Sequence, residues 1–165
     1  MKEYKFKRFD IKVEKVKLPN KTTALMSYMI HNGGVIILAI YEKKIAMIKQ
    51  YRPSIKKYIF ELPAGTLEKN EDPKIRAKKE LKEETGLITD KVKFLFKSYP
   101  TPGVSNEMHY FFLAFPNKKQ KQELEKHEVI KLEFISFEQI KQMIKNNKIM
   151  SGPAIQALLF YLNNK

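Results

Sequence analysis

Three glutamates in the middle of the chain have the types and spacing that could hold a metal ion. Glu83 lies three residues after Glu80, and Glu84 lies four residues after it. On a helix the three carboxylates would therefore share one face and repel one another. Hard divalent cations such as Mg²⁺ prefer carboxylate oxygens and would hold such a cluster together. The spacing thus indicates a candidate site for a divalent cation.

The flanking residues predict the helix that this cluster needs. Asp72 is a favourable N-cap, Pro73 stands where its missing N–H costs nothing, and Gly86 provides a C-terminal stop. We therefore expect a helix from about Pro73 to Thr85.

An ordinary ion-paired surface helix is the alternative interpretation. Arg76 stands four residues before Glu80, and Lys79 stands four residues before Glu83, which is the spacing of helical ion pairs. Most helices rich in glutamate and lysine are solvated faces and nothing more. The sequence around the helix decides between the two interpretations.

Residues 65–87 resemble the Nudix box. Gly65 is followed after five residues by Glu71, and after seven more by Lys-Glu-Leu-Lys-Glu-Glu-Thr-Gly-Leu at residues 79–87. Every fixed position matches except that lysine replaces the family's arginine at position 79. The resemblance implies a loop–helix–loop that binds magnesium and hydrolyses nucleoside diphosphates linked to another group. It also implies Glu80 and Glu84 as metal ligands and Glu83 as a catalytic residue that binds or supports the metal.

The lysine at position 79 changes one interaction of the box. In the family, the arginine at this position pairs with the glutamate four residues later and orients it. Lysine offers a point charge in place of a planar fork. Because Lys79 and Glu83 keep the charge and the helical spacing, we expect a looser pair and a site that still functions.

Two stretches before the box resemble the ADP-ribose pyrophosphatase branch of the family. They are Gln-Tyr-Arg-Pro at residues 50–53 and Glu-Leu-Pro-Ala-Gly at residues 61–65. The resemblance implies that Arg52 contacts substrate, that Glu61 lines the site, and that Ala64 gives its backbone carbonyl to the metal. An ion pair at a strand end is the alternative for Arg52. The chain has only three arginines, however, and arginine suits bidentate contact with phosphate.

A loop after the box resembles the same branch. Residues 100–107 contain two prolines and a glycine, and they end in a glutamate just before a predicted strand. The resemblance implies that Pro102 and Gly103 belong to the substrate site and that Glu107 is the catalytic base or a metal ligand, and we expect it to activate water. A solvated loop carboxylate is the alternative for Glu107, but the junction of a rigid turn and a strand is a usual place for a catalytic side chain.

The composition limits the class of protein. The chain has 165 residues, no cysteine and a net charge of +14 that comes almost wholly from lysine. This length indicates one domain, and the lack of cysteine excludes a disulfide scaffold. No apolar run reaches membrane-spanning length, so we expect no membrane contact and a cytoplasmic protein. The lysines are spread along the whole chain, which disfavours nucleic acid as a partner.

Hydrophobic patterns predict the elements that position these residues. We expect strands at 35–41, 45–51, 92–99, 108–115 and 129–134, helices at 137–145 and 153–162, and a charged loop with little order at 117–128. The Nudix resemblance implies that residues 31–165 form a Nudix hydrolase domain, an α/β/α sandwich with a mixed central sheet.

Residues 1–30 have the alternating pattern of short strands. We expect an N-terminal β arm, which could be an edge of the main sheet or could pair with a partner subunit. Unpaired strand edges are a liability, and the ADP-ribose pyrophosphatase branch is commonly dimeric. We therefore expect a homodimer that uses this arm.

The resemblance implies metal-dependent hydrolysis of the pyrophosphate bond of ADP-ribose or of a related nucleoside diphosphate sugar. From ADP-ribose the products would be AMP and ribose 5-phosphate. Mg²⁺ is the expected cofactor, with Mn²⁺ as a substitute. Two alternatives stay open. A Nudix hydrolase of dinucleoside polyphosphates, capped RNA or oxidised nucleotides would share the box. A non-catalytic nucleotide-binding module would fit if Lys79 had disabled the site.

Overall fold

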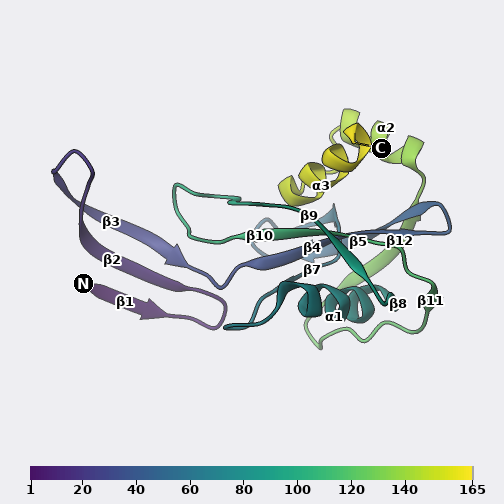
Figure 1. The fold of residues 1–165 in the computed structure, drawn as a ribbon, viewed down its shortest axis with the longest axis horizontal. Helices are drawn as coiled ribbons and strands as arrows, with labels where there is room; N and C mark the ends of the chain where they lie inside the picture. Colours follow the sequence, from purple (N-terminus) through teal and green to yellow (C-terminus); the bar gives the residue numbers. More distant parts are fainter. Residues whose placement is uncertain (165) are drawn as a thin grey trace.

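The computed structural model describes residues 1–164 and has the predicted α/β/α architecture (Figure 1). The main sheet has the strand order β12 (Ile130–Ile135), β5 (Lys44–Arg52), β4 (Gly34–Tyr41), β10 (His109–Ala114) and β9 (Val92–Ser98), with β6 (Lys57–Glu61) paired to β5 and β7 (Ala64–Thr66) paired to β4. Strands β4 and β10 run parallel, and the other pairs are antiparallel. The sheet is therefore mixed, as predicted.

Three helices cover the two faces of this sheet. Helix α1 (Pro73–Thr85) lies on one face, and helices α2 (Phe137–Lys145) and α3 (Gly152–Asn163) lie on the other (Figure 1). Within the described residues, no helix is long and apolar enough to cross a bilayer.

Strand β4 is the centre of both cores. Its side chains alternate between the faces, so Val35 and Ile37 pack with Leu81 of α1, whereas Ile36 and Leu38 pack in the core beneath α2 and α3. All four of these β4 residues are buried. This double coverage explains why the strand has an unbroken apolar sequence.

Helix α1 has the predicted bounds because both of its ends are capped. The Asp72 side chain accepts a hydrogen bond from the Lys74 N–H at 2.7 Å, and Pro73 occupies the first turn. At the other end, Gly86 adopts φ +71° and its N–H donates to the Lys82 carbonyl at 2.8 Å. The capping signals in the sequence were therefore sufficient to place this helix.

The charged segment 117–128 is more ordered than we predicted. Its short strand β11 (Lys118–Lys119) pairs with β8 (Leu87–Ile88). The N–H groups of Gln120 and Glu123 donate to the carbonyls of Gly86 and Glu83 at 2.8 and 2.9 Å. The last carbonyls of a helix have no partner within the helix, and this segment supplies donors to them.

The N-terminal strands β1 (Lys2–Lys5), β2 (Asp10–Lys17) and β3 (Thr23–Ile30) form a separate antiparallel sheet that projects from the sandwich (Figure 1). No residue among 1–32 is buried. Backbone hydrogen bonds join this sheet to the loop before β10: Met29 N–H donates to the Val104 carbonyl at 2.8 Å, and Asn106 N–H donates to the Met29 carbonyl at 3.3 Å.

Candidate active site

Glu80 packs directly against the glycine of the box. Its side chain is only 6% exposed. A Cβ atom added at Gly65 would lie 1.9 Å from Glu80 Oε1 and 2.1 Å from its Cδ. The absence of a side chain at position 65 therefore creates the space in which the Glu80 carboxylate lies between helix α1 and strand β7.

Glu84 contacts the same strand one turn further along the helix. It is 3% exposed, and its Oε2 accepts a hydrogen bond from the Ala64 N–H at 2.8 Å. The structure thus brings Glu80 and Glu84 against the backbone of residues 64 and 65. The Ala64 carbonyl as a metal ligand stays a prediction.

One basic residue of the helix, Arg76, pairs with this cluster. Arg76 Nη2 lies 2.5 Å from Glu80 Oε1. The expected pair between Lys79 and Glu83 was wrong, because no ion pair joins these two side chains in the described part of the chain. Arg76 lies one turn before Glu80, and its side chain is mostly buried. The ion pair of the helix therefore forms between Arg76 and Glu80 and does not involve Glu83.

Burial dominates the electrostatics of the two carboxylates. Desolvation raises the pKa of Glu80 to about 7, although the charge of Arg76 opposes this shift. Desolvation also raises the pKa of Glu84 well above its ordinary value, and the Ala64 N–H only partly opposes it. Burial therefore favours the neutral form of both carboxyl groups.

Glu128 is a carboxylate near this site that the sequence analysis missed. Its negative charge raises the pKa of both Glu80 and Glu84. Its own Oε2 accepts a hydrogen bond from the Glu125 N–H at 2.9 Å, in a turn just before β12. Its position at the junction of a turn and a strand is the signal that we used for Glu107, and it could have identified Glu128 as well.

The side chain of Arg52 on β5 pairs with that of Glu61 on β6. Arg52 Nε donates to Glu61 Oε2 at 2.7 Å, and Arg52 Nη2 lies 2.7 Å from the same oxygen. The charge of Arg52 also lowers the pKa of Glu84. The arginine is therefore within electrostatic reach of the carboxylate site, and its remaining N–H groups have no carboxylate partner among residues 1–164.

Glu107 lies in a different environment, between two histidines. Its Oε1 is 3.1 Å from His109 Nε2 and 3.4 Å from His31 Nδ1. The hydrogen bond from His109 lowers the pKa of the Glu107 carboxyl. The sequence analysis assigned no role to either histidine.

The predicted loop residues lie beside the N-terminal sheet. Pro102 and Gly103 line a hollow of about 390 Å³, together with Tyr28 of β3 and Tyr99. The predicted site residues therefore fall into two groups. Around β7 and helix α1 lie Arg52, Glu61, Ala64, Glu80, Glu84 and also Glu83, whose charge raises the pKa of Glu80. Around the loop before β10 lie Pro102, Gly103 and Glu107.

The residues at β7 fit a hard divalent cation. No three histidine, aspartate or glutamate side chains among residues 1–164 converge into a complete metal cage. Mg²⁺ does not need such a cage, because it binds through one or two carboxylates with water and substrate phosphates as further ligands. Glu80 and Glu84 supply two buried carboxyl groups whose pKa values are raised mainly by desolvation, and a bound cation would favour their ionised forms.

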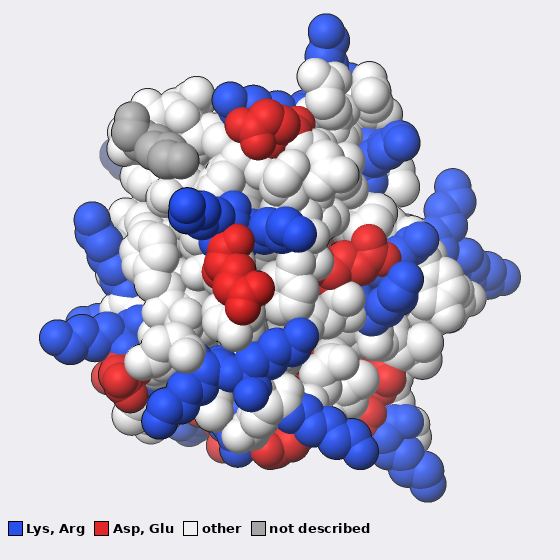
Figure 2. All heavy atoms as spheres, turned by 90° about the vertical axis from the view of Figure 1, so that its right-hand side faces the viewer, with Lys and Arg blue, Asp and Glu red and all other residues white. Residues whose placement is uncertain are grey.

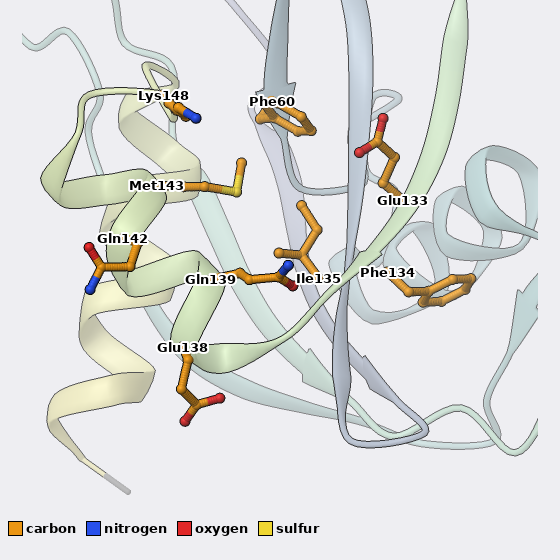
Figure 3. Close-up of a pocket in the computed structure, with 9 residues that line it drawn as sticks. All are labelled: Phe60, Glu133, Phe134, Ile135, Glu138, Gln139, Gln142, Met143 and Lys148. Carbon is orange, nitrogen blue, oxygen red and sulfur yellow. The ribbon is translucent and has the colours of Figure 1, made fainter.

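A cavity of about 610 Å³ opens on the opposite face of the sheet. In Figure 3, Met143 and Gln139 of α2 point toward Ile135 and Phe60 of the sheet, and helix α1 lies beyond the strands. None of the predicted site residues lines this cavity, so it is separate from the carboxylate site.

The charged side chains do not form one basic face. Figure 2 shows lysine and arginine side chains scattered over the side of the sandwich away from the N-terminal sheet, with acidic side chains among them. This distribution offers no continuous track for a nucleic-acid backbone on that side.

Residues 30–157 match the model of the NUDIX domain. The chain therefore belongs to the Nudix family, and it is a Nudix hydrolase. This confirms the family predicted from residues 65–87.

Characterised relatives match across most of their length. The chain is 33% identical over 153 residues to a methanol dehydrogenase activator of Bacillus methanolicus, covering 91% of this chain and 83% of that protein. It is 32% identical over 157 residues to an ADP-ribose pyrophosphatase of Bacillus subtilis strain 168, covering 93% and 85%. It is 36% identical over 142 residues to a GDP-mannose pyrophosphatase of Enterobacter sp. strain 638, covering 79% and 73%.

A solved structure confirms the fold class. The crystal structure of an ADP compounds hydrolase superposes with a TM-score of 0.84 at 17% sequence identity, covering 96% of this chain and 87% of that chain. The superposition includes most of the N-terminal sheet as well as the sandwich, since only 4% of this chain lies outside it.

Proposed function

We propose that this protein hydrolyses the pyrophosphate bond of ADP-ribose, releasing AMP and ribose 5-phosphate. The observation that carries the proposal is the pair of buried carboxylates, Glu80 and Glu84, held against Gly65 and Ala64. The likeness to an ADP-ribose pyrophosphatase over 93% of the chain supports the choice of substrate.

Glu80, Glu84 and the Ala64 carbonyl would hold Mg²⁺, with Mn²⁺ as a substitute, and Glu83 would support them from the same helix. When bound, the cation would polarise the phosphoryl oxygens and lower the pKa of water. Arg52 binds the diphosphate through its remaining N–H groups, and Glu61 fixes the arginine through the 2.7 Å contacts.

A carboxylate outside helix α1 accepts the proton of the attacking water. The sequence analysis predicted Glu107 as the residue that accepts this proton, and that prediction stays open. Glu128 is the better candidate on electrostatic grounds, because its charge acts on both Glu80 and Glu84. A base must lie within hydrogen-bond reach of the water that it activates, and Glu128, unlike Glu107, is among the main charges that shift the pKa of both metal-binding carboxyls.

GDP-mannose is the second candidate substrate. A relative named GDP-mannose pyrophosphatase is 36% identical to this chain over 79% of its length. The carboxylates, Arg52 and the loop would act in the same way on either nucleoside diphosphate sugar. Dinucleoside polyphosphates, capped RNA, oxidised nucleotides and a purely binding role are the further alternatives that the same experiment tests.

We propose that the protein forms a homodimer through residues 1–30 and that residues 31–165 are its catalytic unit. The support is that the N-terminal sheet buries no side chain of its own, and Leu25 on β3 is 70% exposed. A three-stranded sheet without a covered face gains little stability from burial. A cytoplasmic location also stays a prediction.

The function is tested by measuring AMP release from ADP-ribose with and without Mg²⁺. We expect turnover that depends on the metal and that Glu84→Gln abolishes. Substituting Glu128 and Glu107 separately by glutamine then identifies the base, because its loss lowers kcat by about 100-fold or more. If the protein hydrolyses no substrate with either Mg²⁺ or Mn²⁺, the proposal of an enzyme is wrong and the non-catalytic binding module replaces it.

A further inference from the structure

Arg76 differs from the other cationic side chains of helix α1 because it turns toward the carboxylate site. Lys74, Lys78 and Lys79 are exposed. The side chain of Arg76 is only 14% exposed, and its Nη2 lies 2.5 Å from Glu80 Oε1. The chain uses lysine for nearly all of its positive charge and has three arginines, so an arginine at this buried position suggests a specific contact.

Stability alone does not explain why Arg76 is buried. Its Nε is buried and has no hydrogen-bond partner among residues 1–164. An unpaired buried donor costs free energy, and replacing a buried ion pair by apolar side chains often leaves a protein equally stable or more stable. The burial of Arg76 therefore points to a role for its contact with Glu80.

That contact fixes the orientation of the Glu80 carboxylate. Oε1, the oxygen that Arg76 contacts, is also the atom that lies 1.9 Å from the place where a Cβ of residue 65 would stand. The guanidinium on the helix and the backbone of Gly65 on β7 thus enclose the same oxygen. Glutamate is a flexible side chain that loses rotamer freedom when it is held, so a second group at this oxygen keeps the carboxylate in one position.

The departure from the box at position 79 makes this contact more significant. The box has an arginine there that pairs with the glutamate four residues later, but Lys79 forms no ion pair with Glu83 in the described part of the chain. Position 76 is one of the seven that the box leaves open after Glu71, and it too stands four residues before a glutamate, Glu80. The guanidinium therefore lies about one turn earlier on the helix and contacts a different carboxylate.

We propose that Arg76 is a positioning residue of the metal site, which holds Glu80 against Gly65 and takes over the orienting role that the box gives to an arginine at position 79. The inference rests on the proposed function and adds a residue that the box does not specify. Groups that orient metal ligands typically contribute about 10–100-fold to metal affinity or activity. A guanidinium that only neutralised Glu80 would compete with the cation, so the two roles predict changes of opposite sign in metal affinity.

The test measures Mn²⁺ binding by electron paramagnetic resonance without substrate. Arg76→Met keeps an apolar stem of similar length and removes the guanidinium. We expect its Kd for Mn²⁺ to rise by about tenfold or more, with an unchanged circular dichroism spectrum. Arg76→Lys should give an intermediate Kd, because lysine keeps the charge but lacks the planar fork, and it provides the comparison if Arg76→Met does not fold. Lys78→Met removes an exposed charge from the same helix and is the matched control, with the Kd of the parent.

Steady-state kinetics provide the second readout. The Mg²⁺ concentration for half-maximal hydrolysis of ADP-ribose should rise in Arg76→Met, while KM for ADP-ribose at saturating Mg²⁺ stays close to that of the parent. Adding Lys79→Arg to Arg76→Met should restore little, because residue 79 stands four positions before Glu83 and not before Glu80.

Several results would overturn the proposal. They are tighter or unchanged Mn²⁺ binding in Arg76→Met, an equal loss in Lys78→Met, full restoration by Lys79→Arg, and a parent that binds no Mn²⁺. The resonance measurement needs no turnover, so a parent that binds Mn²⁺ but does not hydrolyse ADP-ribose would contradict the proposed function and leave the role of Arg76 to be decided by the Kd values.

Discussion

At the scale of single residues, the site is defined by two carboxylates that the fold buries together. Gly65 leaves space for Glu80, and the Ala64 N–H fixes Glu84. Only Arg76 forms an ion pair with them among the described residues. Burying like charges is unfavourable without a counter-charge, so the arrangement is suited to a bound cation and is costly without one.

Glu84→Gln should separate the stability of this site from its activity. Glutamine can still accept the Ala64 N–H but carries no charge beside Glu80 and Glu128. In the presence of a chelator we expect stability to rise by about 1 kcal/mol, or about 2–4 °C in Tm. Turnover should fall by more than about 100-fold. Thermal melts and Mg²⁺-saturated assays check both, and activity within a few-fold of the parent would remove Glu84 from the metal site.

The raised pKa of Glu80 predicts how stability depends on pH. A carboxyl with a higher pKa in the folded state stabilises the fold below its unfolded pKa and loses that contribution as pH rises through the folded pKa. For Glu80 the window runs from 4.5 to about 7. Metal-free protein should therefore lose up to about 3 kcal/mol across it.

Chemical denaturation at several pH values in chelator measures this slope. Glu80→Gln should reduce the slope between pH 4.5 and 7, with the remainder coming from the raised pKa of Glu84, and Mg²⁺ should restore the stability of the parent at the upper end. Glu107 does not obscure the result, because its lowered pKa puts its titration below the window. An identical slope in parent and variant would contradict the burial of an ionisable Glu80.

Gly65→Ala tests the packing that positions Glu80. The added Cβ would lie 1.9 Å from Glu80 Oε1, so the carboxylate must leave its place. We expect a loss of about 1–3 kcal/mol in the free energy of unfolding and a large fall in kcat/KM. Gly152→Ala is the matched control, because a Cβ there meets no atom within 4 Å. Equal behaviour of the two variants would count against the packing account.

The sequence predicted residues with local signals and missed those that depend on contacts between distant segments. The box identified Glu80 and Glu84 because their roles follow from helical spacing. Glu128 comes to the site from a segment far along the chain. The contact of His109 with Glu107 joins two residues only two positions apart, where the loop meets β10, and composition alone does not show it.

At the scale of elements, the cap at Gly86 connects helix α1 to the segment that carries Glu128. Gly86 has φ +71°, and a Cβ there would lie 2.1 Å from the Gln120 carbonyl oxygen. The helix was predictable because its caps are local. The order of residues 117–128 was not, because their hydrogen-bond acceptors belong to the helix end.

Gly86→Ala should therefore loosen residues 117–128 as well as the helix end. We expect a destabilisation of about 2–4 kcal/mol from the left-handed conformation and the clash together. Hydrogen exchange should show faster exchange at the amides of Gln120 and Glu123, which donate to the helix. Unchanged protection at these amides would show that the segment is held in another way.

At the scale of the whole molecule, the buried cores lie in the sandwich that we propose as the catalytic unit. The N-terminal sheet has no buried residue of its own. The sequence predicted the strands of this sheet but not whether it is an edge or a separate arm. The structure shows a separate sheet that touches the sandwich through the loop before β10. A dimer would cover its faces and steady the loop that carries Glu107.

Light scattering tests this assembly. The monomer has a mass of 19.5 kDa, and we expect twice this mass at micromolar concentration. Leu25→Lys should shift the protein toward the monomer, because Leu25 is apolar and highly exposed on β3. Ser27→Lys on the same strand is a polar comparison that should have a smaller effect. A monomer mass for the parent would contradict the proposed dimer.

The most direct test of the account is the ratio of kcat/KM values for ADP-ribose and GDP-mannose at saturating Mg²⁺, with diadenosine polyphosphate, capped RNA and a nucleoside triphosphate in the same series. The account predicts that ADP-ribose has the highest kcat/KM, that AMP and ribose 5-phosphate are the products, and that Glu84→Gln removes the activity. A higher kcat/KM for another nucleotide would contradict the substrate assignment, and hydrolysis of none of them would contradict the catalytic role of Glu80 and Glu84.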